Sequence, residues 1–158
     1  MSLSKGLYVI LIASFLVLVC AYGLQAVQRA QRMARVTRCA SNLRALWQTQ
    51  LQYQAWVCPY GPLSPKRGHE FWHQWKRVHP SANDFDCPLS EEGRRIGLSY
   101  RGPCRDANRL KPDDPVGADR EGNHGPGQGG NVLLKSGDVR EASESDPLWV
   151  RARETTMD

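Results

Sequence analysis

The residues whose types and spacing suggest chemistry most directly are two histidines one helical turn apart. Residues 69–73 read HEFWH, an HExxH motif formed by His69, Glu70 and His73, and His79 follows ten residues after the first histidine. In zinc peptidases with this spacing, three histidines hold Zn²⁺ while the glutamate activates the metal-bound water. A zinc metallopeptidase is therefore one hypothesis for this chain.

The surroundings of the motif fit a zinc site poorly. Lys76 stands where such peptidases need a glycine to turn the chain back, and the only later methionine is Met157, so a methionine turn is missing. At 100° per residue, the two histidines fall opposite an apolar, mainly aromatic face that is formed by Phe71, Trp72, Trp75 and Val78. We predict an amphipathic helix over 64–79 with the histidines on its solvent side, and a protein that is not an enzyme.

A second set of candidate ligands lies in the segment 105–130, which is rich in Gly, Asp, Asn and Pro. His124 stands among glycines, and we expect it to close this segment through a hydrogen bond, with ligand binding as the alternative. Oxygen ligands suited to Ca²⁺ occur without EF-hand spacing at Asp113, Asp114, Asp119 and Asn123. We predict a long ordered loop and no cofactor, with Ca²⁺ or Zn²⁺ as alternatives.

Five cysteines offer redox chemistry. Cys20 lies in an apolar run and is expected to act as a small apolar residue. Cys39 and Cys58 are nineteen positions apart in one predicted helix, about 28 Å along its axis, so they cannot bridge each other. Each pairs with Cys87 or Cys104, or stays free. Of the two arrangements we prefer Cys39–Cys87 with Cys58–Cys104, and such pairing implies an oxidising compartment.

One long helix must position most of these groups. Residues 7–24 read LYVILIASFLVLVCAYGL without a charge, and no Pro or Gly follows between Gly23 and Pro59. At about 1.5 Å per residue, this run nearly spans a hydrocarbon core of about 30 Å. We predict a transmembrane segment at 7–24 and a helical stalk at 25–58. The stalk carries an apolar stripe formed by Val36, Ala40, Leu43, Leu46, Trp47, Tyr53 and Val57.

The remaining residues, 59–158, are expected to form one small head domain. A short strand is predicted around 98–101, and a hairpin over 131–141 with a two-residue Ser136-Gly137 turn. Val132, Leu134 and Val139 are expected on one face of that hairpin. In the tail, 148–150 is a predicted anchor before the chain frays. The order of a long helix followed by a small antiparallel sheet predicts the α+β class.

Charge is divided unevenly along the chain. Residues 1–58 hold six cations and no Asp or Glu, whereas residues 59–158 hold fifteen cations and all sixteen acids. The stalk arginines advance by three positions and so wind around the helix instead of forming a basic face. Nucleic-acid binding needs such a face or groove, so we predict no nucleic-acid partner and expect the arginines to lie near anionic lipid headgroups.

The first six residues form a short polar leader that ends at Gly6, directly before the apolar run begins at Leu7. This leader resembles the type III signal of type IV pilins and type II secretion pseudopilins. The resemblance implies that a prepilin peptidase cuts after Gly6 and methylates the new N-terminus at Leu7. The family usually has Glu at the fifth mature position, where this chain has Leu11. That departure implies a minor or tip subunit, or an anchored protein that does not polymerise.

Three further motifs resemble the large planctomycete-type family of pilin-like proteins. Residues 39–46 read CASNLRAL, similar to the family's C-x-x-N-L-x-x-(L/I) segment, and Cys87-Pro88 matches its Cys-Pro. His124 is followed by eleven residues and then by Ser136-Gly137, which is an altered form of the family's H-X9-DG motif. The resemblance covers most of the chain in order and implies a pilin-like head.

These features together predict a non-catalytic pilin-like subunit of a type II secretion or type IV pilus system, which assembles through its N-terminal helix. The implied partners are other pilin-like subunits, the inner-membrane assembly machinery, the prepilin peptidase and the lipid bilayer. The positive-inside rule would place the stalk in the cytoplasm, but the cysteines and the leader favour a single-pass inner-membrane protein with its head in the periplasm or outside the cell. The alternatives are the membrane-anchored zinc metallopeptidase and an anchored binding module.

Overall fold

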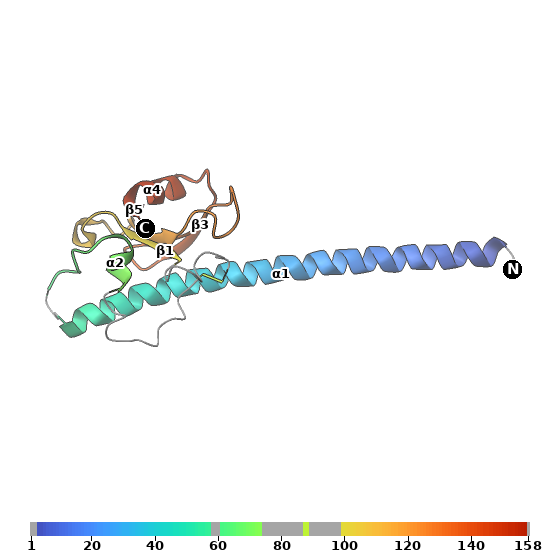
Figure 1. Ribbon diagram of the computed structural model, residues 1–158, viewed down its shortest axis with the longest axis horizontal. Helices are drawn as coiled ribbons and strands as arrows, with labels where there is room; N and C mark the ends of the chain where they lie inside the picture. Colours follow the sequence, from blue (N-terminus) through green and yellow to red (C-terminus); the bar gives the residue numbers. More distant parts are fainter. Residues whose placement is uncertain (1–2, 58–60, 74–86, 89–98, 158) are drawn as a thin grey trace. The chain divides into compact units, whose positions relative to one another are not determined.

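Figure 1 shows the computed structural model of the chain, which describes residues 3–57, 61–73, 87–88 and 99–157. The chain divides into two compact units, Met1–Ala34 and Arg35–Asp158. The elements in chain order are α1 (Leu3–Val57), α2 (Gly68–His73), β1 (Tyr100–Pro103), η3 (Ala107–Arg109), β2 (Pro115–Asp119), β3 (Gly130–Leu134), β4 (Val139–Ala142), α4 (Pro147–Thr155) and β5 (Thr156–Met157).

The first unit, Met1–Ala34, is helical over all of its described residues. No proline interrupts it, and its polar Ser14 donates its hydroxyl to the backbone oxygen of Ile10 at 2.9 Å. That bond satisfies the hydroxyl within the helix, as an apolar surrounding requires. The large apolar side chains that the structure describes in this unit are exposed. By length and composition, the described part of the chain holds one helix that could cross a membrane.

The second unit begins with residues 35–57 of α1, which bury one face against the head. The predicted stripe is confirmed over its first three turns, since Val36, Leu43, Leu46 and Trp47 are buried. Cys39 and Gln50 share this face and are also buried, although neither was predicted to belong to it. The prediction is wrong for Val57, which is exposed, because the packed part of the helix ends near the half-buried Tyr53.

A five-stranded antiparallel sheet forms the centre of the head, in the order β4-β3-β2-β1-β5. Side chains alternate between its two faces: Leu133 packs with residues of α1 and α2, whereas Val132 and Leu134 pack with Trp149 of α4. Figure 1 shows α4 on one side of the sheet and α2 with this part of α1 on the other. The predicted α+β class is confirmed.

The prediction of a loop over 105–130 is wrong, because Pro115–Asp119 form β2 inside the sheet with all five residues buried. Pro, Gly and Asp disfavour strands, so β2 owes its conformation to the strands paired on both of its sides. Its small residues are needed there, since a Cβ at Gly117 would lie 2.7 Å from the ring of Trp72. A register shift between Pro115 and Gly117 turns Val116 toward α1 and Ala118 toward α4.

The predicted hairpin is present as β3 and β4, but its turn is longer than predicted. The amide of Leu134 donates to the carbonyl of Asp138 at 2.8 Å, and Gly137 has a φ of 94°. Three-residue hairpin loops commonly end in a residue with this left-handed conformation. The extra residue changes the pairing, so Val139 lies opposite Leu133 and packs in the same cluster as Leu133, away from Val132.

The prediction that the tail frays after residue 150 is wrong. Residues Pro147–Thr155 form α4, whose N-cap Asp146 accepts the amide of Leu148 at 2.7 Å. β5 then pairs with β1 and places Met157 opposite Gly102. An aspartate followed by proline is a favourable helix start, so the sequence did contain a signal for this helix.

The helix predicted over 64–79 is described only as α2, Gly68–His73. Residues 64–67 are not part of the helix. Gly68, its first residue, has a φ of 56°, which lies outside the right-handed helical region, so the helix cannot extend back through it. Phe71 and Trp72 are fully buried, as predicted for the aromatic face. Trp75 and Val78, the other predicted members of that face, lie outside the described residues.

Asn108 attaches the segment before α2 to the head. Its side chain accepts the amide of Leu63 at 2.6 Å and donates to the Leu63 carbonyl at 2.8 Å. Asp106 caps η3 by accepting the amide of Asn108 at 3.0 Å. This backbone hydrogen bond, with the side-chain bond from Asn108, lowers the pKa of the Asp106 carboxyl below its usual value.

Gly102 marks the closest approach between α2 and the sheet. A Cβ at this position would lie 1.9 Å from the backbone oxygen of Gly68. We expect Gly102→Ala to lower the free energy of unfolding by about 1–3 kcal/mol through overpacking. Denaturant unfolding of the full chain in detergent micelles, followed by tryptophan fluorescence, measures this effect.

The control for this prediction is Gly122→Asn. Gly122 has open space around its Cα and a φ of 82°, which asparagine tolerates better than most residues. We expect the free energy of unfolding to change by no more than about 0.5 kcal/mol at this surface position. Equal losses in both variants would contradict a steric role for Gly102.

Candidate functional site

The HExxH residues lie on α2 with two of them exposed. His69 and Glu70 point away from the buried aromatic pair, and Glu70 forms a surface ion pair with Lys66 at 3.9 Å. The rings of His69 and His73 are 5.5 Å apart, edge to face. The structure therefore brings these two histidines together, while His79 lies outside the described residues. This part of the prediction stays untested.

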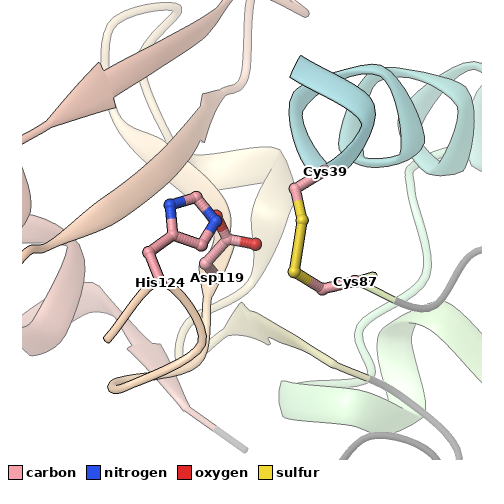
Figure 2. Close-up of side chains that lie close together, drawn as sticks. All are labelled: Cys39, Cys87, Asp119 and His124. Carbon is pink, nitrogen blue, oxygen red and sulfur yellow. A yellow bond between two sulfur atoms is a disulfide. The ribbon is translucent and has the colours of Figure 1, made fainter. Parts of the chain in front are cut away.

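The structure instead gathers four potential ligands at a position that the sequence did not indicate. Cys39 of α1, Cys87, Asp119 of β2 and His124 are all buried, and their ligand atoms all lie within 4.8 Å of one another. Figure 2 shows Asp119 and His124 side by side, facing the Cys39–Cys87 disulfide. Within the described ranges, this is the one group of three or more His, Cys, Asp or Glu residues that could hold a metal ion. We call these four residues the buried cluster.

Asp119 is the most constrained member of the buried cluster. Its Oδ2 accepts the backbone amide of Asn131 at 2.7 Å and the side-chain amide of Asn131 at 3.0 Å, and it lies 2.9 Å from His124 Nε2. The side chain of Asn131 also donates to the carbonyl of Val36 at 3.3 Å. The carboxylate is therefore connected to both the sheet and α1.

The other carboxylate oxygen of Asp119 has no such partners. Oδ1 is buried and accepts no hydrogen bond from any residue in the described ranges. In Figure 2 one oxygen of Asp119 lies at the imidazole, whereas the other is directed toward the disulfide. Buried polar atoms without a partner are uncommon and costly, so this oxygen requires an explanation.

A tight turn places His124 next to Asp119. The amide of Asn123 donates to Arg120 at 3.2 Å, and the amide of Gly125 donates to Gly122 at 2.9 Å. The side chain of Asn123 donates to the carbonyl of Ser99 at 2.8 Å and so fixes the turn to the start of β1. The positive φ values of Gly122 and Gly125 allow this reversal. His124 thus lies at 2.9 Å from the Asp119 carboxylate, and the hydrogen bond predicted to close the segment stays a prediction.

Of the predicted disulfides, Cys39–Cys87 is confirmed, with a Cα–Cα distance of 5.0 Å. Cys58, the predicted partner of Cys104, lies outside the described residues. Cys104 is a free thiol in the structure and donates to the carbonyl of Glu154 at 3.6 Å. Cys20 is a free, exposed cysteine of the first unit.

The predicted Ca²⁺ ligands do not meet at one site. Asp114 accepts the amide of Lys111 at 2.8 Å within a local turn, and the backbone carbonyl of Asp113 accepts a hydrogen bond from Arg151. Asp119 and Asn123 instead turn into the interior, where they bind Asn131 and Ser99. The four positions are therefore divided between the surface and the core.

Spacing alone does not predict the buried cluster, because Cys39, Cys87 and the Asp119–His124 turn come from three separate segments of the chain. Asp119 was a candidate ligand only for Ca²⁺, as the alternative to an ordered loop, and the two cysteines were expected only as a disulfide. Two signals pointed to His124: its place among glycines and the altered H-X9-DG motif. Comparison of the chain with protein-family models, curated proteins and solved structures found no match.

Proposed function

We propose that this protein is a non-catalytic pilin-like or pseudopilin-like subunit of a type II secretion or type IV pilus system. The observation that carries the proposal is the division of α1. Residues 7–24 are uncharged and the apolar side chains described there are exposed, whereas the same helix buries its face between Val36 and Gln50 in a disulfide-linked head. Such a helix can pack against lipid or against the same segment of other subunits.

The leader that ends at Gly6 and the pilin-like motifs also suggest how the protein is processed and where it is located. A prepilin peptidase removes residues 1–6 and methylates Leu7, and the protein stays in the inner membrane as a single-pass protein with its head in the periplasm or outside the cell. Its partners are the lipid bilayer, other pilin-like subunits and the inner-membrane assembly machinery. Leu11, in place of the family's Glu, makes it a minor or tip subunit. An anchored binding module that never polymerises is the alternative.

Mass spectrometry of the mature N-terminus tests the proposal. In cells that contain a prepilin peptidase, we expect a chain that begins at methylated Leu7. We expect Gly6→Val to prevent cleavage, because the peptidase recognises the residue before the cut. Gly23→Val is the matched control, since both glycines lie in the helix with open space around them.

The possible results separate the alternatives. A wild-type chain that keeps Met1 would favour the anchored module, and cleavage between residues 20 and 26 would indicate an ordinary secretory signal. Equal processing of Gly6→Val and the wild type would also contradict the proposal.

A further inference from the structure

We propose that the buried cluster is a redox-gated zinc site. In the oxidised protein, Cys39 and Cys87 form a disulfide. When that bond is reduced, the two sulfurs, the Asp119 carboxylate and the His124 imidazole bind one Zn²⁺ ion. The disulfide and the metal are then two alternative ways to link α1 to the segment at Cys87.

The composition of the cluster supports zinc over harder ions. Two thiolates, one imidazole and one carboxylate are ligands that Zn²⁺ uses in four-coordinate sites. Thiolates and imidazole do not suit Ca²⁺ or Mg²⁺, which prefer oxygen ligands. All four side chains are buried, so water does not compete for the ion as it would at an exposed site such as His69.

The distances within the cluster also fit. Bonds of about 2.3 Å to sulfur and about 2.0–2.2 Å to nitrogen and oxygen place the ligand atoms of a tetrahedral site about 3.3–3.8 Å apart. The ligand atoms of the cluster already lie within 4.8 Å of one another. Small rotations of side chains would therefore complete the site once the sulfur–sulfur bond is broken.

The free oxygen of Asp119 is the second, independent observation. Oδ2 is held by both amide groups of Asn131, which is the kind of outer hydrogen bond that orients metal ligands. Oδ1 is buried without a hydrogen-bond donor from the described residues, and one oxygen of this carboxylate faces the disulfide (Figure 2). A cation between this oxygen and the two sulfurs would satisfy it.

The chemistry balances with an external dithiol as the reductant. The dithiol transfers two electrons and two protons to the disulfide, so Cys39 and Cys87 become thiols while the dithiol becomes a disulfide. Zn²⁺ then displaces the two thiol protons into solvent as it binds. In the reverse direction, one cysteine thiolate attacks an external disulfide and forms a mixed disulfide, and the second thiolate then attacks that mixed disulfide. The Cys39–Cys87 bond re-forms, the external disulfide is reduced to a dithiol, and the ion is released.

The experiment uses the full chain in detergent micelles, with Cys20, Cys58 and Cys104 replaced by serine so that only the two cluster cysteines remain. One sample is kept oxidised, and the other is reduced with a phosphine that is then removed without air. Both are mixed with Zn²⁺, freed of unbound metal, and analysed for zinc per chain. We expect one zinc per reduced chain and none per oxidised chain.

Variants locate the site. In the reduced background we expect His124→Ala to lose the stoichiometric zinc and Asn131→Ala to bind it about 10–100-fold more weakly, as loss of an outer hydrogen bond does. His69→Ala is the matched control and should keep one zinc. Circular dichroism checks that each variant is folded. If His124→Ala does not fold, Co²⁺ added to the reduced parent chain replaces it, because tetrahedral cobalt with two thiolates has a distinct absorption spectrum.

Three results would overturn the proposal: no zinc in the reduced chain, equal zinc in both redox states, or a cobalt spectrum without thiolate ligation. Retention of zinc by a folded His124→Ala together with its loss in His69→Ala would assign the metal to α2 instead. None of these outcomes depends on N-terminal processing, so the proposed subunit function can fail or hold separately.

Discussion

Replacement of Trp72 by alanine is expected to lower the free energy of unfolding of the full chain by about 3–5 kcal/mol. Trp72 is fully buried and is one of the largest buried side chains described. Its ring packs edge to face on Phe71 with centroids 4.9 Å apart, and its Nε1 donates to the carbonyl of Arg101 at 3.1 Å. The variant loses the contacts and leaves this carbonyl without its donor.

We expect a large loss of stability because two glycines of the sheet lie directly against the indole ring of Trp72. A Cβ at Gly117 would lie 2.7 Å from the ring, and a Cβ at Gly102 would lie 3.1 Å from Nε1. The cavity left in Trp72→Ala borders two residues that have no side chain to fill it, so we expect it to collapse poorly.

Trp56→Ala is the matched control, because it removes the same side chain from a position that is 83% exposed. We expect a change within about 0.5 kcal/mol for that variant. Chemical unfolding in detergent micelles, followed by circular dichroism so that both variants use the same signal, measures the two effects. A similar loss for both variants would contradict the claim that the burial of Trp72 causes its effect on stability.

The parts of the fold that sequence predicted correctly are those in which one periodic pattern decides the structure. The buried face of α1 follows the helical repeat from Val36 to Trp47, and the hairpin follows from two apolar runs around Ser136-Gly137. In both cases, the residues that specify the element are close in sequence. Elimination along α1 also left Cys39 few possible partners, and the preferred one, Cys87, is correct.

The errors occur where tertiary packing overrides local preference. β2 contains Pro115, Gly117 and Asp119, residues that disfavour strands, yet it pairs on both sides within the sheet. No local pattern predicts such a strand, because its stability comes from β1 and β3. α4 is different: the Asp146-Pro147 helix start was present in the sequence and was overlooked.

The buried cluster could not be predicted from spacing. Asp119 and His124 are close in sequence, but Cys39 and Cys87 lie far from them and from each other, and the disulfide and the turn after β2 bring the four together. The HExxH motif has a regular spacing that makes it easy to recognise in sequence, yet His69 and Glu70 are exposed. Regular spacing identifies ligands on one element, whereas ligands from several elements are found only after the elements are placed.

Replacement of both Cys39 and Cys87 by alanine is expected to destabilise the head by about 4 kcal/mol, since the disulfide closes a loop with a sequence separation of 48 residues. Removing both cysteines leaves no new free thiol. A loss of this size is a large share of the stability of a typical domain, about 5–15 kcal/mol. Denaturant unfolding of the oxidised full chain, with a metal chelator present, measures the difference.

Cys104→Ser is the control, because Cys104 is a free thiol in the structure. We expect the free energy of unfolding of this variant to stay near that of the wild type. Reduction of the wild type in the presence of the chelator should reproduce most of the loss seen in the double variant. If the reduced wild type were as stable as the oxidised protein, the packing of Leu43, Leu46 and Trp47 would hold α1 to the head without a covalent link. The disulfide would then contribute to the redox chemistry of the buried cluster and not to the stability of the fold.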